Sequence, residues 1–138
     1  MRMRFKILAI IAFLAGLLLP AGSRAAAPGD GYDVFVPISK YLTQGNADAL
    51  SAWFADNLEL SVVSRSADAS RLQARQILKA FFDSHTPRGF TITHTAGRAN
   101  MKYLIGDLNA GGENFMVTIF VICQDSSYKI QQLKIDRR

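Results

Sequence analysis

Cysteine is almost missing from this chain of 138 residues, in which Cys123 is the single one. An internal disulfide is therefore excluded, and stability has to come from packing. Cys123 lies within an apolar stretch, where a lone thiol is most simply a small buried hydrophobic residue. The sequence also lacks a nucleophile elbow, a phosphate-binding glycine motif and a dinucleotide-binding fingerprint, so the enzyme classes that depend on these motifs have no support.

The sequence also lacks an apolar run long enough to span a bilayer, which takes about 20 residues. The uncharged apolar stretch 7–19 follows a basic start and precedes small residues that end at Ala25. This pattern predicts a Sec-type signal peptide over 1–25, cleaved after Ala25, and an exported protein that is periplasmic or secreted. No cysteine lies directly after the stretch, within 20–32, so we expect no stable membrane anchor after cleavage.

Positive charge is no longer in excess once this segment is set aside. The full chain has 16 Lys and Arg against 11 Asp and Glu, and four of the basic residues but none of the acids lie within 1–25. The remainder therefore has 12 basic and 11 acidic residues, a net charge of +1. Nucleic-acid binding needs a concentrated cationic face, so no nucleic-acid partner is expected.

Residues 26–32 read as a small-residue linker and 33–138 as one domain. Apolar residues at helical spacing predict a first helix over 33–44. Asp33 is placed to cap this helix, and Pro37 is tolerated because it falls near the first turn.

A stop and a restart follow this helix. Gly45 suits a left-handed helix end, and Asn46 suits the cap of a second helix. Alternation over 58–64 then predicts a half-exposed strand. The residues expected on the inward face of the second helix are Leu50, Trp53 and Phe54.

Residues 65–69 read as a polar loop, after which Ser70-x-x-Gln73 forms a capping box that opens a third helix. Thr86 and Pro87 end this helix, and His85 suits its C-terminus, where an imidazolium is favourable. The apolar stripe expected to pack against the sheet is Ala74, Ile77, Leu78, Phe81 and Phe82.

The hydrophobic period changes to two from Phe90 onward, which predicts four strands. Their connections are short and rich in turn residues, so consecutive strands should pair antiparallel. The strands are expected at 90–96, 101–108, 115–124 and 128–136.

The element order α-α-β-α-β-β-β-β resembles the nuclear-transport-factor-2-like superfamily, which includes ketosteroid isomerases. The resemblance implies an α+β fold in which three N-terminal helices pack on a strongly curved, mostly antiparallel sheet, forming a cone with an open mouth. The helix–glycine–helix–strand motif of the superfamily is matched by Leu42, Gly45, Asn46, Leu50, Phe54, Asp56 and Asn57.

The chain is also similar to a family of small exported proteins within that superfamily, catalogued as domain of unknown function 4783. This resemblance spans nearly the whole predicted domain and implies a fold without an activity. The segments that carry it are Pro37-Ile38, 77–82, 90–94, 103–108 and 132–135.

The isomerase branch needs a carboxylate base and a pair of hydrogen-bond donors. Aligned on the shared motif, the place of the donor tyrosine falls at Ile38 and that of the base at Val62, and 115–124 contains no acid. An apolar residue cannot carry a proton, so isomerase chemistry is not expected here.

His94 is the best remaining candidate for a catalytic residue. It alternates with Phe90 and Ile92, so we expect it to project toward the helices and any cavity. A desolvated imidazole there could act as a base with Asp107 or Tyr103, or orient a polar ligand. The alternative is a histidine at the edge of the core that bonds to a backbone carbonyl or a carboxylate, which is the more common arrangement.

No metal site and no cofactor are expected, because the possible ligands are scattered without the short spacings of metal motifs. Together with His94, three aromatic residues are expected to line a pocket mouth: Trp53, Tyr103 and Phe115. The alternative for these aromatic residues is simple core packing, which is more frequent for such spacing.

The stretch 115–123 is apolar on both faces of its predicted strand. The helices cover one face only, and an uncovered apolar patch indicates an association surface. We therefore expect a homodimer that packs through the outer face of the sheet, formed by Met116, Phe120 and Ile122.

Three functional hypotheses follow. The first is a non-catalytic exported domain that binds a small apolar ligand or a partner segment in its cone. The second is an acid/base enzyme that uses His94 in the pocket. The third is a structural or assembly protein with a filled interior, and a hollow or filled cone distinguishes it from the first.

Overall fold

The computed structural model describes residues 32–138. The predicted signal peptide over 1–25 and the linker up to residue 31 lie outside the described residues. A 3₁₀ turn, Tyr32–Val34, precedes three α-helices and six strands. The helices are α3 (Phe35–Gln44), α4 (Ala47–Ser51) and α5 (Arg71–Ser84); the strands are β2 (Phe54–Val62), β3 (Arg65–Ser70), β4 (Pro87–Arg98), β5 (Met101–Ala110), β6 (Glu113–Gln124) and β7 (Ser127–Arg137).

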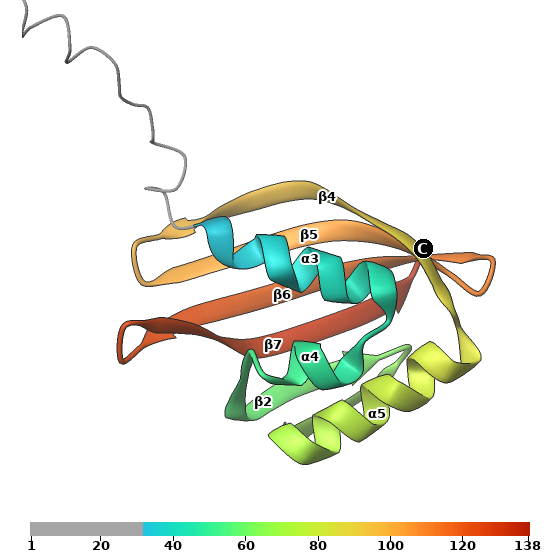
Figure 1. Cartoon of the computed structure of the whole chain (residues 1–138), viewed down its shortest axis with the longest axis horizontal. Helices are drawn as coiled ribbons and strands as arrows, with labels where there is room; N and C mark the ends of the chain where they lie inside the picture. Colours follow the sequence, from blue (N-terminus) through green and yellow to red (C-terminus); the bar gives the residue numbers. More distant parts are fainter. Residues whose placement is uncertain (1–31) are drawn as a thin grey trace, which may run out of the picture. The chain divides into compact units, whose positions relative to one another are not determined.

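The strands form one curved sheet in the order β3-β2-β7-β6-β5-β4. All neighbours are antiparallel except β2 and β7, which pair parallel. The three helices cover one face of this sheet (Figure 1). The helix α3 packs against β4 and β5, whereas α5 packs against β2 and β3. The predicted α+β fold and the antiparallel meander of the last four strands are confirmed.

The predicted stop between the first two helices is confirmed at Gly45, which has φ 67° and ψ 31°. The N–H groups of Gly45 and Asn46 donate to the carbonyl oxygens of Leu42 and Tyr41 at 3.2 and 2.9 Å, which is a Schellman motif. The Asn46 side chain then accepts from the Ala49 N–H at 3.0 Å and caps α4. This pair of residues turns the chain sharply.

The predicted cap of the first helix is wrong, because α3 begins at Phe35 and its cap position is Val34, which makes no side-chain cap. The predicted second helix is too long: α4 ends at Ser51, and Phe54 is a buried residue of β2. The Trp53 carbonyl accepts from the Ile130 N–H at 2.6 Å. Sheet pairing therefore starts before the alternating pattern becomes visible in the sequence.

The predicted polar loop over 65–69 is also wrong, because these residues form the edge strand β3. Backbone pairing with β2 sets Ser66 against Ser61 and Ala67 against Leu60. Only Ala69 is buried on this strand. Strand formation here depends on the neighbouring backbone and not on side-chain propensity, which is low for this composition.

The capping box that opens α5 is confirmed in both directions. The Gln73 N–H donates to the Ser70 hydroxyl at 3.2 Å, and the Ser70 N–H donates to the Gln73 side chain at 3.0 Å. Four residues of the predicted stripe are buried: Ala74, Leu78, Phe81 and Phe82. The fifth, Ile77, is 41% exposed, and this difference marks the candidate site.

Candidate functional site

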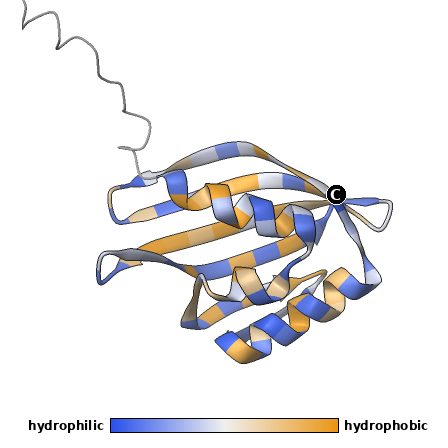
Figure 2. Ribbon diagram, viewed as in Figure 1, coloured by the Kyte–Doolittle hydropathy of each residue, from blue (hydrophilic) through white to orange (hydrophobic). Residues whose placement is uncertain are grey.

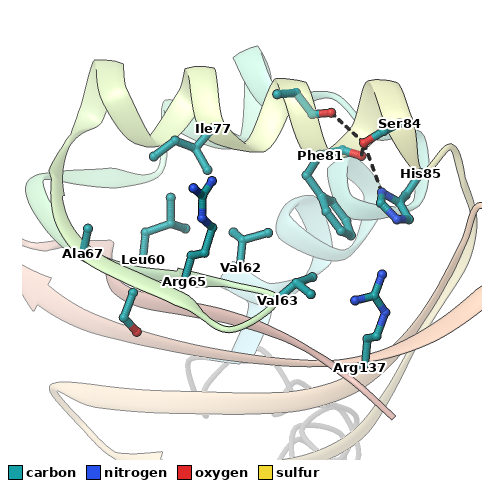
Figure 3. A pocket seen from close by; sticks show the side chains of 12 residues that line it. Leu60, Val62, Val63, Arg65, Ala67, Ile77, Phe81, Ser84, His85 and Arg137 are labelled. Carbon is teal, nitrogen blue, oxygen red and sulfur yellow. Dashed lines mark hydrogen bonds between the residues drawn. The ribbon is translucent and has the colours of Figure 1, made fainter.

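A cavity of about 600 Å³ lies between α5 and the β2–β3 hairpin (Figure 3). The helix contributes one wall, the hairpin the opposite wall, and β7 the end near the C-terminus. The lining residues are Leu60, Val62, Val63, Arg65, Ser66, Ala67, Ile77, Ala80, Phe81, Ser84, His85 and Arg137.

The two long walls are mainly apolar. Ile77 and Phe81 are spaced by four residues, so their side chains lie on one face of α5. The ring of His85, which follows the helix, stacks on that of Phe81. On the hairpin, Leu60 and Val62 alternate with outward residues of β2 and therefore point to the same side. Because the facing strand β3 supplies small side chains such as Ala67, space remains between helix and hairpin (Figure 3).

The hairpin turn holds Val63 at φ 46° and Ser64 at φ 71°. Positive φ is unusual for a β-branched residue and costs about 1–3 kcal/mol when the surroundings enforce it. The Val63 N–H donates to the Ile135 carbonyl at 2.8 Å, which ties this turn to β7. The strained turn thus forms part of the cavity wall.

Two arginines supply the positive charge of the cavity. The Arg65 side chain rises from the hairpin toward α5 beside Ile77 (Figure 3). Within residues 32–138, Arg65 forms no ion pair and no side-chain hydrogen bond. Arg137 donates through Nε to Glu113 Oε1 at 3.0 Å. The cationic groups of the cavity therefore outnumber the acids near them.

His85 is held in place at the end of α5. Its backbone N–H donates to the Phe81 carbonyl at 2.8 Å, and its ring stacks on that of Phe81 with centroids 4.7 Å apart. The ring atom Nδ1 lies 3.1 Å from the Ser84 hydroxyl, and Nε2 lies 3.7 Å from Glu113 Oε2. The predicted position of His85 at the helix C-terminus is confirmed, and the same position places its ring in the cavity wall.

The four residues predicted to line a pocket do not converge. Trp53 is half-buried in the turn between α4 and β2. Phe115 is fully buried behind the cavity wall, with its ring centroid 5.2 Å from that of Phe81. His94 and Tyr103 lie near each other, with centroids 5.7 Å apart, on the opposite face of the sheet. None of these four residues lines the cavity.

The predicted inward orientation of His94 is wrong because β4 contains a β-bulge. Ile92 pairs with Gly106, but His94 pairs with Ile105, so Thr93 is an extra residue. A bulge shifts the alternation by one position. Phe90 and Ile92 therefore face the helices, while the exposed His94 faces outward. The hypothesis of acid/base chemistry by His94 in a pocket loses its structural basis.

The predicted outer surface of β6 has the expected orientation. Met116, Phe120 and Ile122 are half-exposed and alternate with fully buried residues. The ring of Phe120 stacks on Tyr103 of β5, with centroids 5.2 Å apart. Figure 2 shows that β6 is hydrophobic along most of its length. We call Tyr103, Met116, Phe120 and Ile122 the outer apolar patch.

Across residues 32–138, no three His, Cys, Asp or Glu side chains gather in a way that suits a metal ion. In the same range, no helix has the length and apolar character that crossing a membrane requires.

The cavity lining contains three ionisable side chains. Its ionisable lining residues are Arg65, His85 and Arg137, and no carboxylate is among the residues that line it. Val62, at the place of the isomerase base, is an apolar wall residue, and Ile38, at the place of the tyrosine, is buried in the core. A proton acceptor and donor pair of the isomerase type is therefore missing from these two positions.

The fold is that of nuclear-transport-factor-2-like proteins. A protein of unknown function from Silicibacter pomeroyi, described as similar to nuclear transport factor 2, superposes with a TM-score of 0.63 at 15% identity, covering 83% of this chain and 100% of its own. A domain of unknown function with a cystatin-like fold from Nostoc punctiforme gives a TM-score of 0.64 at 11% identity, covering 83% of this chain and 79% of its own. At these identities only the fold is shared.

Within this class, the chain belongs to the family domain of unknown function DUF4783, whose model matches residues 35–136. A solved member of the family from Bacteroides fragilis is 28% identical, with a TM-score of 0.71, and the match covers 75% of this chain and 97% of that one. The family resemblance inferred from the sequence is confirmed, and the predicted fold is shared with nuclear-transport-factor-2-like proteins. None of the curated proteins matches the chain.

Sequence reasoning missed Arg65, Arg137 and the cavity role of His85. These residues come from β3, β7 and the end of α5, so no local motif brings them together. The one available signal was the four-residue spacing of Ile77, Phe81 and His85, which places the histidine next to the apolar face of the helix.

Proposed function

We propose that this protein is an exported, non-catalytic binding domain that takes a small, largely apolar ligand in the cavity between α5 and the β2–β3 hairpin. The observation that carries the proposal is the cavity itself, with about 600 Å³ and mainly apolar walls. Ligand sites in proteins commonly have volumes of about 300–1,000 Å³ and apolar linings with few polar groups. Export rests on the predicted signal peptide.

A filled-cavity variant tests the ligand site. Ala80 is an exposed wall residue of α5, so Ala80→Trp would occupy the space that a ligand needs. Leu72→Trp is the matched control, because Leu72 is exposed on the same helix but does not line the cavity. Both changes introduce the same ring without altering charge.

The measurement is thermal unfolding and native mass spectrometry of the purified protein with a panel of medium-chain alcohols and carboxylates. A ligand at about 100 times its Kd stabilises the folded state by about 2.7 kcal/mol. We expect this stabilisation in the wild type and in Leu72→Trp, and its loss in Ala80→Trp. Absence of binding across the panel in the wild type would contradict the proposal, and so would unchanged binding by Ala80→Trp.

The outer apolar patch favours a second role, self-association into a homodimer. Its side chains are half-exposed on a face that the helices leave uncovered. Exposed apolar surface of this kind indicates a contact site in proteins. A lysine in the middle of such an interface would bury an unpaired charge, which is strongly unfavourable.

Sedimentation equilibrium tests this second role. We expect a dimer for the wild type, a monomer for Phe120→Lys, and a dimer for the control Asn57→Lys, since Asn57 is exposed on β2 away from the patch. A wild type that stays strictly monomeric at micromolar concentration would refute the dimer. Retention of the dimer by Phe120→Lys would place the interface elsewhere.

A further inference from the structure

We propose that the ligand of this cavity is a small amphipathic monocarboxylate, whose carboxylate is held by Arg65 at the Ile77 end and whose apolar chain lies along α5 toward His85. The inference rests on the proposed binding function and adds the chemical class of the ligand. The observation behind it is an apolar channel whose charged lining groups are cations, one of them without an acidic partner in the described chain.

The position of Arg65 points to an anion. Arg65 is the first residue of β3, directly after the strained Val63–Ser64 turn, and its guanidinium lies beside the apolar side chain of Ile77 (Figure 3). Three arginines of α5 and β7 are paired: Arg71 with Asp56, Arg75 with Asp48, and Arg137 with Glu113. Arg65 forms no such pair with any described residue. Its donors remain available to a ligand carboxylate.

The second cation, Arg137, is oriented by the protein. Glu113 accepts from Arg137 Nε at 3.0 Å, and the guanidinium carbon lies 5.9 Å from the centroid of the buried Phe115 ring. One edge of the guanidinium is thus occupied, and no described residue is hydrogen-bonded to its terminal nitrogens. Arg137 lies at the His85 end of the cavity, away from Arg65, and its charge is balanced by Glu113.

The charge balance favours a monoanion. Arg65 and Arg137 contribute two positive charges, and Glu113 beside Arg137 cancels one of them. His85 lies between the same glutamate and the cavity, with Nε2 3.7 Å from Glu113 Oε2. A single carboxylate matches the remaining positive charge of Arg65, whereas a dianion such as a phosphate monoester would leave one negative charge without a partner.

The apolar wall determines the shape of the apolar part of the ligand. From Ile77 to His85 the helix advances about 12 Å at 1.5 Å per residue, and Ala80 and Phe81 lie within this span on the cavity side. A linear or monocyclic apolar group fits along it. The Phe81 and His85 rings, stacked at 4.7 Å, form the flat end of the wall near the Arg137 cation.

Titration calorimetry with three ligands of one chain length tests the charge preference. The ligands are decanoate, decanol and decyltrimethylammonium, each titrated into the purified wild type, Arg65→Gln and Arg98→Gln. Arg98→Gln is the matched control because Arg98 is an exposed arginine at the far end of β4 that does not line the cavity. Each variant loses one positive charge.

We expect the wild type to bind decanoate at least about fivefold more tightly than decanol, because the carboxylate accepts charge-assisted hydrogen bonds. The cationic ligand should bind most weakly. Arg65→Gln should remove most of this preference by weakening decanoate binding alone. Arg98→Gln should keep the preference. Shortening the alkyl chain of the carboxylate by one methylene should weaken binding by about fourfold, because less apolar surface is buried.

The outcomes separate this inference from the function on which it rests. Equal affinity for decanoate and decanol, or tighter binding of the cation, overturns the carboxylate class while an apolar binding site stands. A preference that survives Arg65→Gln overturns the role of Arg65. Decyl phosphate is titrated as a fourth ligand, and tighter binding of it than of decanoate overturns the monoanion. Failure of all ligands to bind, with the folded state intact by circular dichroism, overturns the binding function itself.

Discussion

The two sides of this domain use their helices differently. Under α3, the side chains that meet the sheet are fully buried, with Ile38 and Leu42 at 0% exposure against Leu104 and Leu108 of β5, also at 0%. Under α5, by contrast, Ile77 is 41% exposed and borders a cavity. The sequence patterns of both helices are amphipathic, so helix pattern alone does not determine whether the space beneath is filled.

The difference lies in the strands that each helix meets. The helix α3 packs on β4 and β5, whose inward residues include large apolar side chains, whereas α5 packs on β2 and the edge strand β3. Strand β3 presents mostly small or polar residues, and only Ala69 is buried. We infer that the α3 side supplies most of the stability, and that the α5 side retains space for a ligand.

A matched pair of isoleucine truncations tests whether the two sides of the domain are packed differently. Ile38→Ala should lower the free energy of unfolding by about 2–5 kcal/mol, because it leaves a cavity in a closed core. Ile77→Ala should lower it by less than about 1 kcal/mol, since this side chain is already partly in solvent. Urea unfolding measures both. Similar losses would mean that the two sides are equally packed.

A second prediction concerns the closed side, where the Phe90 ring covers Gly106. A Cβ atom at Gly106 would come within 2.5 Å of Phe90 Cζ and 2.7 Å of the Thr91 carbonyl oxygen. Gly106→Ala should therefore destabilise the protein by about 1–3 kcal/mol. Gly89→Ala on the same strand pair is the control, because its Cβ would meet nothing within 4 Å. Equal unfolding midpoints for the two variants would contradict tight packing at Gly106.

The third prediction concerns the strained turn beside the cavity, where the expected change in stability is the smallest. Asn tolerates positive φ better than Val does, so Val63→Asn should stabilise the protein by about 1 kcal/mol. The same change places an amide in the cavity wall, so binding of an apolar ligand should weaken. The control is Asp125→Asn, at φ 50° in the β6–β7 turn, for which we expect less than about 0.5 kcal/mol. A destabilised Val63→Asn would mean that the turn is not strained.

The fold was largely predictable because its decisive signals are local. The left-handed stop at Gly45, the cap at Asn46 and the Ser70–Gln73 box each act within a few residues and are found as expected. The strand β3 was not predictable in this way, since its residues favour loops and form a strand only through pairing with β2. Long-range pairing overrides weak local preference.

The candidate site was hardly predictable, for a related reason. The outward orientation of His94 depends on one inserted residue, Thr93, and alternation counted along the sequence cannot reveal a bulge. The cavity joins Arg65, His85 and Arg137 from three separate elements. Arg65 and Arg137 border the same cavity because the β2–β3 hairpin lies beside β7 through the parallel pairing of β2 with β7.

The bulge at Thr93 also affects how readily the protein aggregates at high concentration. It lies on β4, the outermost strand at one end of the sheet, where unpaired backbone groups invite foreign strands to add on. The Thr93 hydroxyl donates to the Ile105 carbonyl at 3.1 Å, which anchors the irregular geometry, and arginines stand near both ends of the strand. An edge strand that is bent and charged resists the growth of fibrils.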